Sequence, residues 1–525
     1  MAVMLFYLDL VWTLSQSGFI GFWVGNIIFV IIFGALSVRK NSLSLPSLLR
    51  QKSFQILIGM QLVFLLATFL TVNPIPRLQN FSLPHLLSNT TNSQKASTAS
   101  PSPATTQPVA SPQPALDASI TGSGNIRKIV WQGALDIWKA YPIFGSGVET
   151  YAFAYYKYRP EAHNLTSEWD YLYNKAHNEF LNYLATTGAF GLGTYLIFLG
   201  SFLFFAGKYM VQQWRRKVVG EALLPALIGS IIGIQVSNFF GFAVVNVNML
   251  MFLIPIFYWS LTKPTHKLFT LPSSAQKDYV TSISPGTGGL MVIGGLFIFC
   301  LYCIMFLVNY WNADIHYGLG YNYNRINAFN EANPSLEKAV QMRGGEDLYK
   351  NELSVNLAAL ALMAAQQKDL NTASGYATRA KALSDEVATK NPNNVVYWKA
   401  RTRVMFSLAE LNPATLSDSV TAIERASILA PTDAKVIYNQ ALIYDQIGEK
   451  EKALSLLDKA VRLKIDYKDA HYAKALFLSQ KAESNKADKT LNESLKKQAR
   501  DTLNFILSNI SPNDQQSKDL LKTLE

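Results

Sequence analysis

The sequence predicts an all-α protein in two parts, a polytopic helical membrane domain followed by an extracytoplasmic α-solenoid. Apolar residues make up 49% of the 525 residues, more than a soluble chain with one core usually contains. They gather in long runs within residues 1–310, whereas residues 311–525 carry charges throughout. The second part also repeats small and large apolar positions at a fixed interval, which is typical of stacked helix pairs.

Six apolar segments are long enough to cross a membrane, because a helix needs about 20 apolar residues to span the hydrocarbon core. Residues 1–12 are apolar but too short to cross alone, and they lack the basic start of a signal peptide. They resemble the end of a helix whose beginning is absent. The predicted spans are 17–38, 54–72, 181–207, 223–242, 244–261 and 290–310.

Basic residues set the predicted orientation, since connections rich in lysine and arginine stay in the cytoplasm. Residues 73–180 and everything after residue 310 are therefore expected on the outer side of a multi-pass plasma-membrane protein. The net charge of +11 is explained largely by the inner connections and does not indicate nucleic-acid binding. The residues that carry this argument are Arg39, Lys40, Arg50, Lys52, Lys208, Arg215, Arg216, Lys217, Lys263, Lys267 and Lys277.

The outer segment between the second and third spans has two contrasting halves. Residues 88–125 are rich in Ser, Thr, Pro and Ala, a composition that cannot bury enough apolar surface to fold, and they predict a disordered linker. Residues 126–180 are dense in Trp and Tyr and predict an ordered extracytoplasmic catalytic-type loop. Within this loop, one amphipathic helix should begin near Arg127 and end at Tyr141-Pro142, after which "PIFGSG" turns the chain back. The predicted domains are membrane helices in 1–87, the linker 88–125, the loop 126–180, membrane helices in 181–310 and repeats in 311–525.

The repeat register is clearest near the end of the chain. The preceding unit matches 34 residues earlier, where Ile423 and Ala426 correspond to Leu457 and Ala460. This is the pattern of a tetratricopeptide helix pair, and a stack of such pairs forms a concave binding surface rather than a catalytic fold. The positions that define the register are Ala434, Ala441, Tyr444, Gly448, Ala453, Leu457 and Ala460.

Three polar residues of the loop are candidates for function. His177 stands where a polar run meets an apolar helix; a lone histidine there is usually a surface or cap residue, yet a neutral imidazole can take a proton from a hydroxyl. Arg127 and Arg159 can clamp a diphosphate through paired hydrogen bonds, and their alternatives are a lipid-headgroup anchor and a loop salt bridge. Cys300 and Cys303 lie inside the last span without acidic or histidine neighbours, which favours helix packing over redox or metal chemistry.

Residues 127–196 carry a resemblance to a known family. The sequence "RKIVWQGALDIWKAYPIFGSG" is followed, after a loop, by "AHNEFLNYLATTGAFGLGTYL". This order resembles the conserved region of the O-antigen ligase and polymerase superfamily, polytopic glycosyltransferases that act on polyprenyl diphosphate-linked glycans. The resemblance extends over residues 1–262, and bacterial members with a tetratricopeptide tail are familiar. The family's loop arginine falls on Arg127 and its essential histidine on His177, while Arg159 matches less closely.

The resemblance implies a membrane glycosyltransferase of the ligase or polymerase type that works at the outer face, with no cofactor and no metal. Arg127, together with Arg159, would hold the diphosphate, and His177 would orient or deprotonate the acceptor hydroxyl. The implied partners are a polyprenyl diphosphate-linked glycan, a glycan, lipid or protein acceptor, and a protein bound by the repeats. His163 matches no family position, so its replacement is expected to be close to neutral.

Two other functions stay open at this point. In protein O-glycosylation the same chemistry would act on a polypeptide that the repeats present. In a non-catalytic membrane scaffold the helices would serve only to display the repeats.

The chain departs from the family pattern at two places. The family has an arginine in a Ser-Arg-Gly setting at the outer start of a helix, where this chain has Ser15, Gln16, Ser17 and Gly18. The family also commonly has more spans than the six predicted here, so we expect an N-terminal half to be absent or encoded separately. The activity of this chain alone depends on both features.

Overall fold

The computed structural model describes residues 2–41, 50–71, 74–79, 82–84, 121–218, 222–262 and 287–524. Helices are the only regular elements within these ranges, which confirms the predicted all-α class. The chain forms two compact units. The first contains residues 1–110, 127–152 and 173–269, and the second contains residues 111–126, 153–172 and 270–525.

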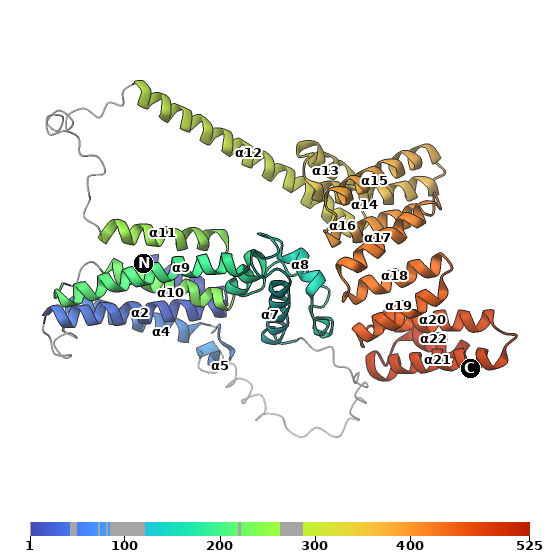
Figure 1. The fold of residues 1–525 in the computed structure, drawn as a ribbon, viewed down its shortest axis with the longest axis horizontal. Helices are drawn as coiled ribbons and strands as arrows, with labels where there is room; N and C mark the ends of the chain where they lie inside the picture. The colour runs from blue at the N-terminus through green and yellow to red at the C-terminus, as the bar shows by residue number, and fades with distance from the viewer. Residues whose placement is uncertain are drawn as a thin grey trace, which may run out of the picture. The chain divides into compact units, whose positions relative to one another are not determined.

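The first unit holds most of the apolar helices (Figure 1). By length and composition, α2, α9 and α11 can each cross a membrane, as can α12 of the second unit. Helices α4 and α10 cover the predicted spans 54–72 and 223–242 as shorter apolar helices. The bounds are α1 (Ala2–Trp12), α2 (Gln16–Asn41), α4 (Lys52–Leu70), α5 (Pro76–Gln79), α7 (Ser123–Ala140), α9 (Glu179–Arg215), α10 (Leu223–Phe239) and α11 (Val245–Thr262).

Helices α2 and α10 approach each other closely through glycines. A Cβ atom built on Gly21 would lie 2.5 Å from the carbonyl oxygen of Gly233, and one built on Gly25 would lie 2.5 Å from that of Gly229. Both helices therefore present glycines four residues apart, the spacing that lets membrane helices pack backbone to backbone. This contact brings the start of α2 to the end of α10.

The second unit is a stack of helix pairs preceded by a long apolar helix (Figure 1). Helix α12 does not end at residue 310 but continues to Arg325, a length of about 58 Å at 1.5 Å per residue, so the predicted span and the first repeat helix are one element. The repeat helices are α12 (Thr287–Arg325), α13 (Phe329–Met342), α14 (Asp347–Gln366), α15 (Leu370–Lys390), α16 (Val395–Leu408), α17 (Thr415–Leu429), α18 (Ala434–Gln446), α19 (Lys450–Leu463), α20 (Lys468–Ser484), α21 (Lys489–Phe505) and α22 (Gln515–Thr523).

The packing of α18 against α19 follows the predicted register. Ala434, Ala441, Ala453, Leu457 and Ala460 are all buried, and they share one apolar cluster. Small residues at these positions let the two helices of a pair approach closely, which is why the register can be recognised from the sequence.

The aromatic loop predicted as one segment is divided between the two units. Residues 127–140 of α7 and residues 173–178 belong to the first unit, whereas residues 153–172 belong to the same unit as the repeats. The predicted linker lies outside the described residues up to residue 120, and its last residues already form the start of α7. Helix α8 (Tyr151–Tyr158) begins in the first unit and ends in the second.

Candidate functional site

A break in helix α9 is filled by the turn that follows α7. Gly188 has φ +67° inside α9, so the residues around it cannot form the usual helical hydrogen bonds. The turn supplies the missing partners through four backbone bonds. Ser146 N and Gly147 N donate to Ala185 O and Thr186 O at 3.0 and 2.9 Å, and Ala189 N and Phe190 N donate to Pro142 O and Ile143 O at 2.9 and 3.1 Å.

Glycine is required on both sides of this junction. A Cβ on Gly188 would lie 2.2 Å from Ile143 O, and one on Gly145, which has φ +70°, would lie 2.3 Å from the backbone of Thr186. The turn is predictable from "PIFGSG" in the sequence, but the helix break that it completes is not. Helices α7 and α9 are therefore joined by backbone contacts that leave no room for a side chain.

The junction predicts a selective effect of Gly188→Ala. The added methyl group collides with Ile143 O and places alanine at positive φ, a conformation that alone costs about 1–3 kcal/mol. We expect a clear fall in the thermal unfolding midpoint of the detergent-solubilised chain. Gly193→Ala in the same helix is the matched control, because its Cβ meets no atom within 4 Å. Equal tolerance of the two changes would contradict the junction.

His177 lies two residues before α9 and is half-buried. Its backbone has φ +53°, a left-handed conformation that is uncommon outside glycine but is adopted by histidine more often than by most residues. The next residue, Asn178, caps α9 by accepting a hydrogen bond from Leu181 N at 3.0 Å. The imidazole ring meets Tyr173 and Phe242 edge to face, with ring centroids 5.6 and 5.2 Å away. Neighbours on both sides thus fix the ring.

Arg127 lies on the first turns of α7 and reaches the end of α10. Its Nη1 donates to Phe240 O at 3.0 Å. One turn further along α7, Trp131 packs edge to face on Phe239 at 6.0 Å. The described contacts give Arg127 no acidic partner, so its charge is not neutralised by a carboxylate within that part of the chain.

The segment 240–243 between α10 and α11 is where the candidate residues come together. Arg127 bonds to its first residue, and His177 packs on its third, Phe242. The N–H of Ala243 donates to Glu179 Oε2 at 3.3 Å. A methyl group built on Gly241 would lie 3.5 Å from Ser17 Oγ, so the position where the family pattern has its Ser-Arg-Gly motif also faces this segment.

Glu179 is the residue of this region that the sequence analysis missed. It is 5% exposed and lies at the start of an apolar helix. An acidic residue next to a membrane-spanning run is rare enough to indicate function or a specific partner. That signal was present in "AHNEF" beside His177. The contact with Ala243 shows that Glu179 helps to place segment 240–243 against α9.

Arg159 lies apart from this group, within the second unit. It is 4% exposed, and its guanidinium donates to Trp169 O at 3.0 Å, to Asn164 Oδ1 at 2.5 Å and to Thr432 O at 3.3 Å. The structure thus surrounds Arg159 with the protein's own acceptors. Arg127 and His177 meet at one segment, and Arg159 instead ties residues 153–172 to the repeats.

The environment of His163 argues against the expectation that its replacement is close to neutral. Its side chain is fully buried; Nδ1 lies 2.8 Å from the hydroxyl of Tyr155, and Nε2 lies 3.2 Å from Glu168 O. A smaller side chain would leave a cavity and two unpaired polar groups. Because a buried histidine and an exposed one look alike in a loop sequence, its position in the chain gave no warning.

Burial of His163 predicts a pH dependence of the loop. Burial, with Arg159 nearby, lowers the pKa of His163 to about 4 from its usual 6.5. Since the unfolded segment binds the proton more tightly, the full stabilisation is present above pH 6.5 and is lost as the pH falls toward 4. We expect hydrogen exchange in residues 153–172, corrected for intrinsic rates, to accelerate over this window. His163→Gln should abolish the dependence, and an unchanged dependence in that variant would assign it to another group.

No group of three metal-ligating side chains occurs among the described residues. What the residues around segment 240–243 offer is a guanidinium, an imidazole and a carboxylate at the ends of apolar helices. A guanidinium binds phosphate oxygens in pairs, and an imidazole accepts a proton near neutral pH. The arrangement suits an anionic substrate with an apolar part and a hydroxyl that loses its proton.

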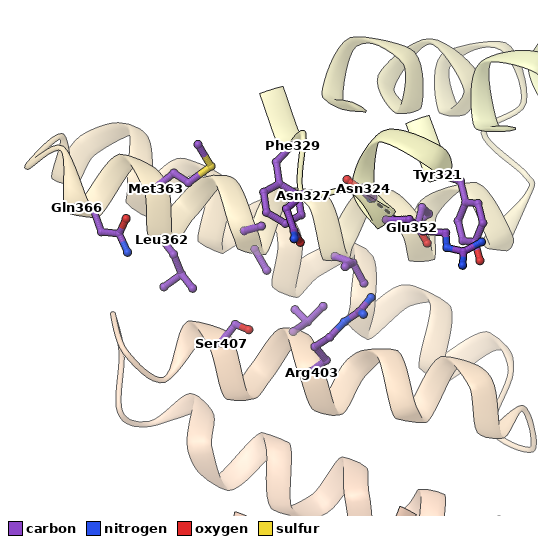
Figure 2. Close-up of a pocket in the computed structure, with 15 residues that line it drawn as sticks. Tyr321, Asn324, Asn327, Phe329, Glu352, Leu362, Met363, Gln366, Arg403 and Ser407 are labelled. Atoms are coloured by element: carbon purple, nitrogen blue, oxygen red, sulfur yellow. Dashed lines mark hydrogen bonds between the residues drawn. The ribbon is translucent and has the colours of Figure 1, made fainter. Parts of the chain in front are cut away.

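The repeats contain a separate cavity of about 590 Å³ (Figure 2). Figure 2 shows Leu362 and Met363 of α14 on one side and Arg403 and Ser407 of α16 on the other. A second cavity of about 490 Å³ shares Arg403 with the first. The two cavities also share Glu352 and form a groove along the stack, lined by apolar side chains with arginines, a carboxylate and amides between them.

Comparison with protein families finds matches in two parts of the chain. Residues 1–196 match the O-antigen ligase family model. This O-antigen ligase region contains Arg127, Arg159 and His177, as well as the turn after α7 and the break at Gly188, while segment 240–243 lies beyond it. Residues 434–465 match the tetratricopeptide repeat model, which confirms the repeat register. No curated protein matches the chain.

The solved structures similar to the chain include a TPR protein. A thermophilic TPR protein of Thermus thermophilus is 15% identical, with a TM-score of 0.29, covering 40% of this chain and 98% of its own. MamA from Desulfovibrio magneticus is 18% identical, with a TM-score of 0.28, and the match covers 37% of this chain and 94% of the MamA chain. PilF of Pseudomonas aeruginosa is 15% identical, with a TM-score of 0.27, and the match covers 41% of this chain and 90% of the PilF chain. Scores this low do not define the fold of the whole chain.

Proposed function

We propose that this chain is a membrane glycosyltransferase of the ligase or polymerase type, which transfers glycan from a polyprenyl diphosphate carrier at the outer face of the membrane. The O-antigen ligase region supports a glycosyltransferase-like function. The single observation that carries the finer proposal is the convergence of Arg127 and His177 on segment 240–243. A cation and a base at the ends of apolar helices fit a donor with a charged head and a lipid tail.

The chemistry is a direct displacement at the anomeric carbon. The oxygen of the acceptor hydroxyl forms the new glycosidic bond as the bond from the anomeric carbon to the diphosphate breaks. Polyprenyl diphosphate leaves with the bonding electron pair, and Arg127 stabilises its charge. The hydroxyl proton passes to His177. Arg159, already bonded to protein acceptors, has no direct part in this scheme.

The direction of the helices supports placement at the outer face. Ser17, at the start of α2, and His177, before α9, both face segment 240–243. The opposite ends of the same helices carry the basic residues, and Arg39 lies 4.7 Å from the centre of the Trp214 ring. Basic helix ends favour the cytoplasm, so the candidate residues belong to the other side.

A protein acceptor is the second candidate, and the groove of the repeats favours it. Arg325 and Arg403 line the groove together with the carboxylate of Glu352 and the amides of Asn327 and Gln366. Amides bind the backbone of an extended peptide, and the two arginines would suit acidic side chains. The same transfer chemistry would then modify a polypeptide held by the repeats.

Transfer activity tests the proposal directly. His177→Ala should lower glycan transfer from a polyprenyl diphosphate glycan in reconstituted membranes by about 10²- to 10⁴-fold, because a positioned base contributes that much. Arg127→Lys should also impair transfer, since an ammonium keeps the charge but loses the paired geometry. Wild type and variants are compared at equal membrane insertion, with any separately encoded helices supplied.

Lys128→Ala is the matched control, because Lys128 is the exposed neighbour of Arg127. It should leave transfer unchanged. Full activity in His177→Ala would reject the catalytic role and leave His177 as a residue that shapes the start of α9. Absence of transfer by the wild type would favour the scaffold alternative.

A further inference from the structure

Helix α12 joins an apolar span to the repeats without a break. It is continuous from Thr287 to Arg325. Its apolar part is long enough to cross a membrane, and none of the most apolar window is buried within the protein. A helix rises by a fixed 1.5 Å per residue. A membrane that surrounds the apolar part therefore fixes the height of every later residue of α12, and of whatever packs on those residues.

The first turn of the repeats, residues 343–346 between α13 and α14, packs on α12 at the end of its apolar part. The guanidinium carbon of Arg343 lies 4.8 Å from the centre of the Phe306 ring and 4.3 Å from that of the Tyr310 ring. The hydroxyl of Tyr310 donates to Glu346 Oε2 at 3.4 Å. The turn is thus held beside residues that the sequence predicts to be inside the span.

The next turn of α12 makes this contact rigid. Ala313 is fully buried and shares one apolar cluster with Ala339 of α13 and Tyr349 of α14. The hydroxyl of Tyr349 also donates to Asp314 Oδ1 at 2.9 Å. Close-packed side chains leave little room for the helices to slide past one another, so the height of α12 also sets the height of the turn.

The length of the apolar part places this turn at a membrane surface. From Thr287 to Phe306 the helix rises about 28 Å at 1.5 Å per residue, close to the roughly 30 Å of the hydrocarbon core. Tyr310 and the 68% exposed Trp311 follow, and both residue types favour the boundary between hydrocarbon and headgroups. Because Arg343 lies against Phe306, its guanidinium is at the level of the headgroups.

The charges of the turn suit phosphate. The carboxylate of Glu346 receives the hydroxyl of Tyr310, and Asp347 Oδ2 receives Asn391 Nδ2 at 2.8 Å. The ion pairs of the described residues include Asp347 but not Arg343. An arginine without a carboxylate partner binds phosphate oxygens in pairs, and phosphate is the anionic group of phospholipid headgroups.

We propose that the turn 343–346 rests on the headgroup layer of the membrane that α12 crosses, with Arg343 bound to phospholipid phosphate. Every contact that supports this lies within the second unit, and the proposal is independent of the glycosyltransferase function. The part of α12 that lines the groove, from Tyr321 to Arg325, then lies about 16–23 Å beyond Tyr310. A partner of the groove is therefore met in water and not within the lipid.

The test uses the full chain in vesicles of phosphatidylcholine, with or without phosphatidylglycerol. Cys300→Ala and Cys303→Ala remove the native thiols, after which Gly345→Cys carries a spin label in the turn. Gly345 is exposed, and a Cβ built on it meets no atom within 4 Å. Leu370→Cys is the matched control, because Leu370 is 70% exposed and lies beyond the opposite end of α14.

The label at Gly345 should be less accessible to a water-soluble relaxation agent than the label at Leu370, and phosphatidylglycerol should increase this protection. Arg343→Gln should abolish the increase, whereas Arg343→Lys should retain part of it, since an ammonium keeps the charge. Equal accessibility at Gly345 and Leu370 would overturn the membrane contact. If Arg343→Gln loosens the turn equally in both kinds of vesicle, Arg343 only holds the turn on α12, and its binding to phosphate is rejected.

Discussion

The four backbone hydrogen bonds between the turn after α7 and the break at Gly188 join the two helices that carry the candidate residues of the proposed site. They replace helical hydrogen bonds that α9 cannot form around Gly188. The turn and the break in the helix therefore stabilise each other. From this junction α7 runs back to Arg127 over about 20 Å at 1.5 Å per residue, and α9 runs back to Glu179 and His177 over a shorter distance. Both helices reach segment 240–243, which the glycine contact between α2 and α10 holds in place. The junction at Gly188 and the glycine contact between α2 and α10 therefore set the positions of the candidate side chains.

The two candidate arginines show how burial separates roles that a sequence cannot. Both lie in the aromatic loop, both lie within the O-antigen ligase region, and either could hold a diphosphate by its chemistry. Arg127 is half-buried, has one carbonyl partner and lies at the segment that also receives His177. Arg159 is enclosed by three acceptors and ties residues 153–172 to the repeats. A guanidinium that already satisfies protein carbonyls would have to break those bonds to receive a substrate.

Local signals in the sequence predicted local features well. Pro142 marked the end of α7, and Gly145 with Gly147 marked the turn. The spacing of Ala434, Ala441 and Ala453 marked a helix pair. The break at Gly188, the glycine contact between α2 and α10 and the burial of His163 arise from segments far apart in the chain. Glycine inside an apolar helix is compatible with flexibility, close packing or a break, and only the neighbouring backbone decides which applies. For the same reason, the division of the aromatic loop between two units could not be foreseen from its composition.

The account as a whole depends on which side of the membrane the start of α9 lies, because a lipid-linked glycan at the outer face can meet His177 only there. An enzyme reporter that is active only outside the cytoplasm measures this directly. Fused after Glu525 it should be active, and fused after Arg216, at the basic end of α9, it should be silent. The reverse pattern would place His177 and Arg127 in the cytoplasm, and it would contradict both the proposed donor and the proposed site of action.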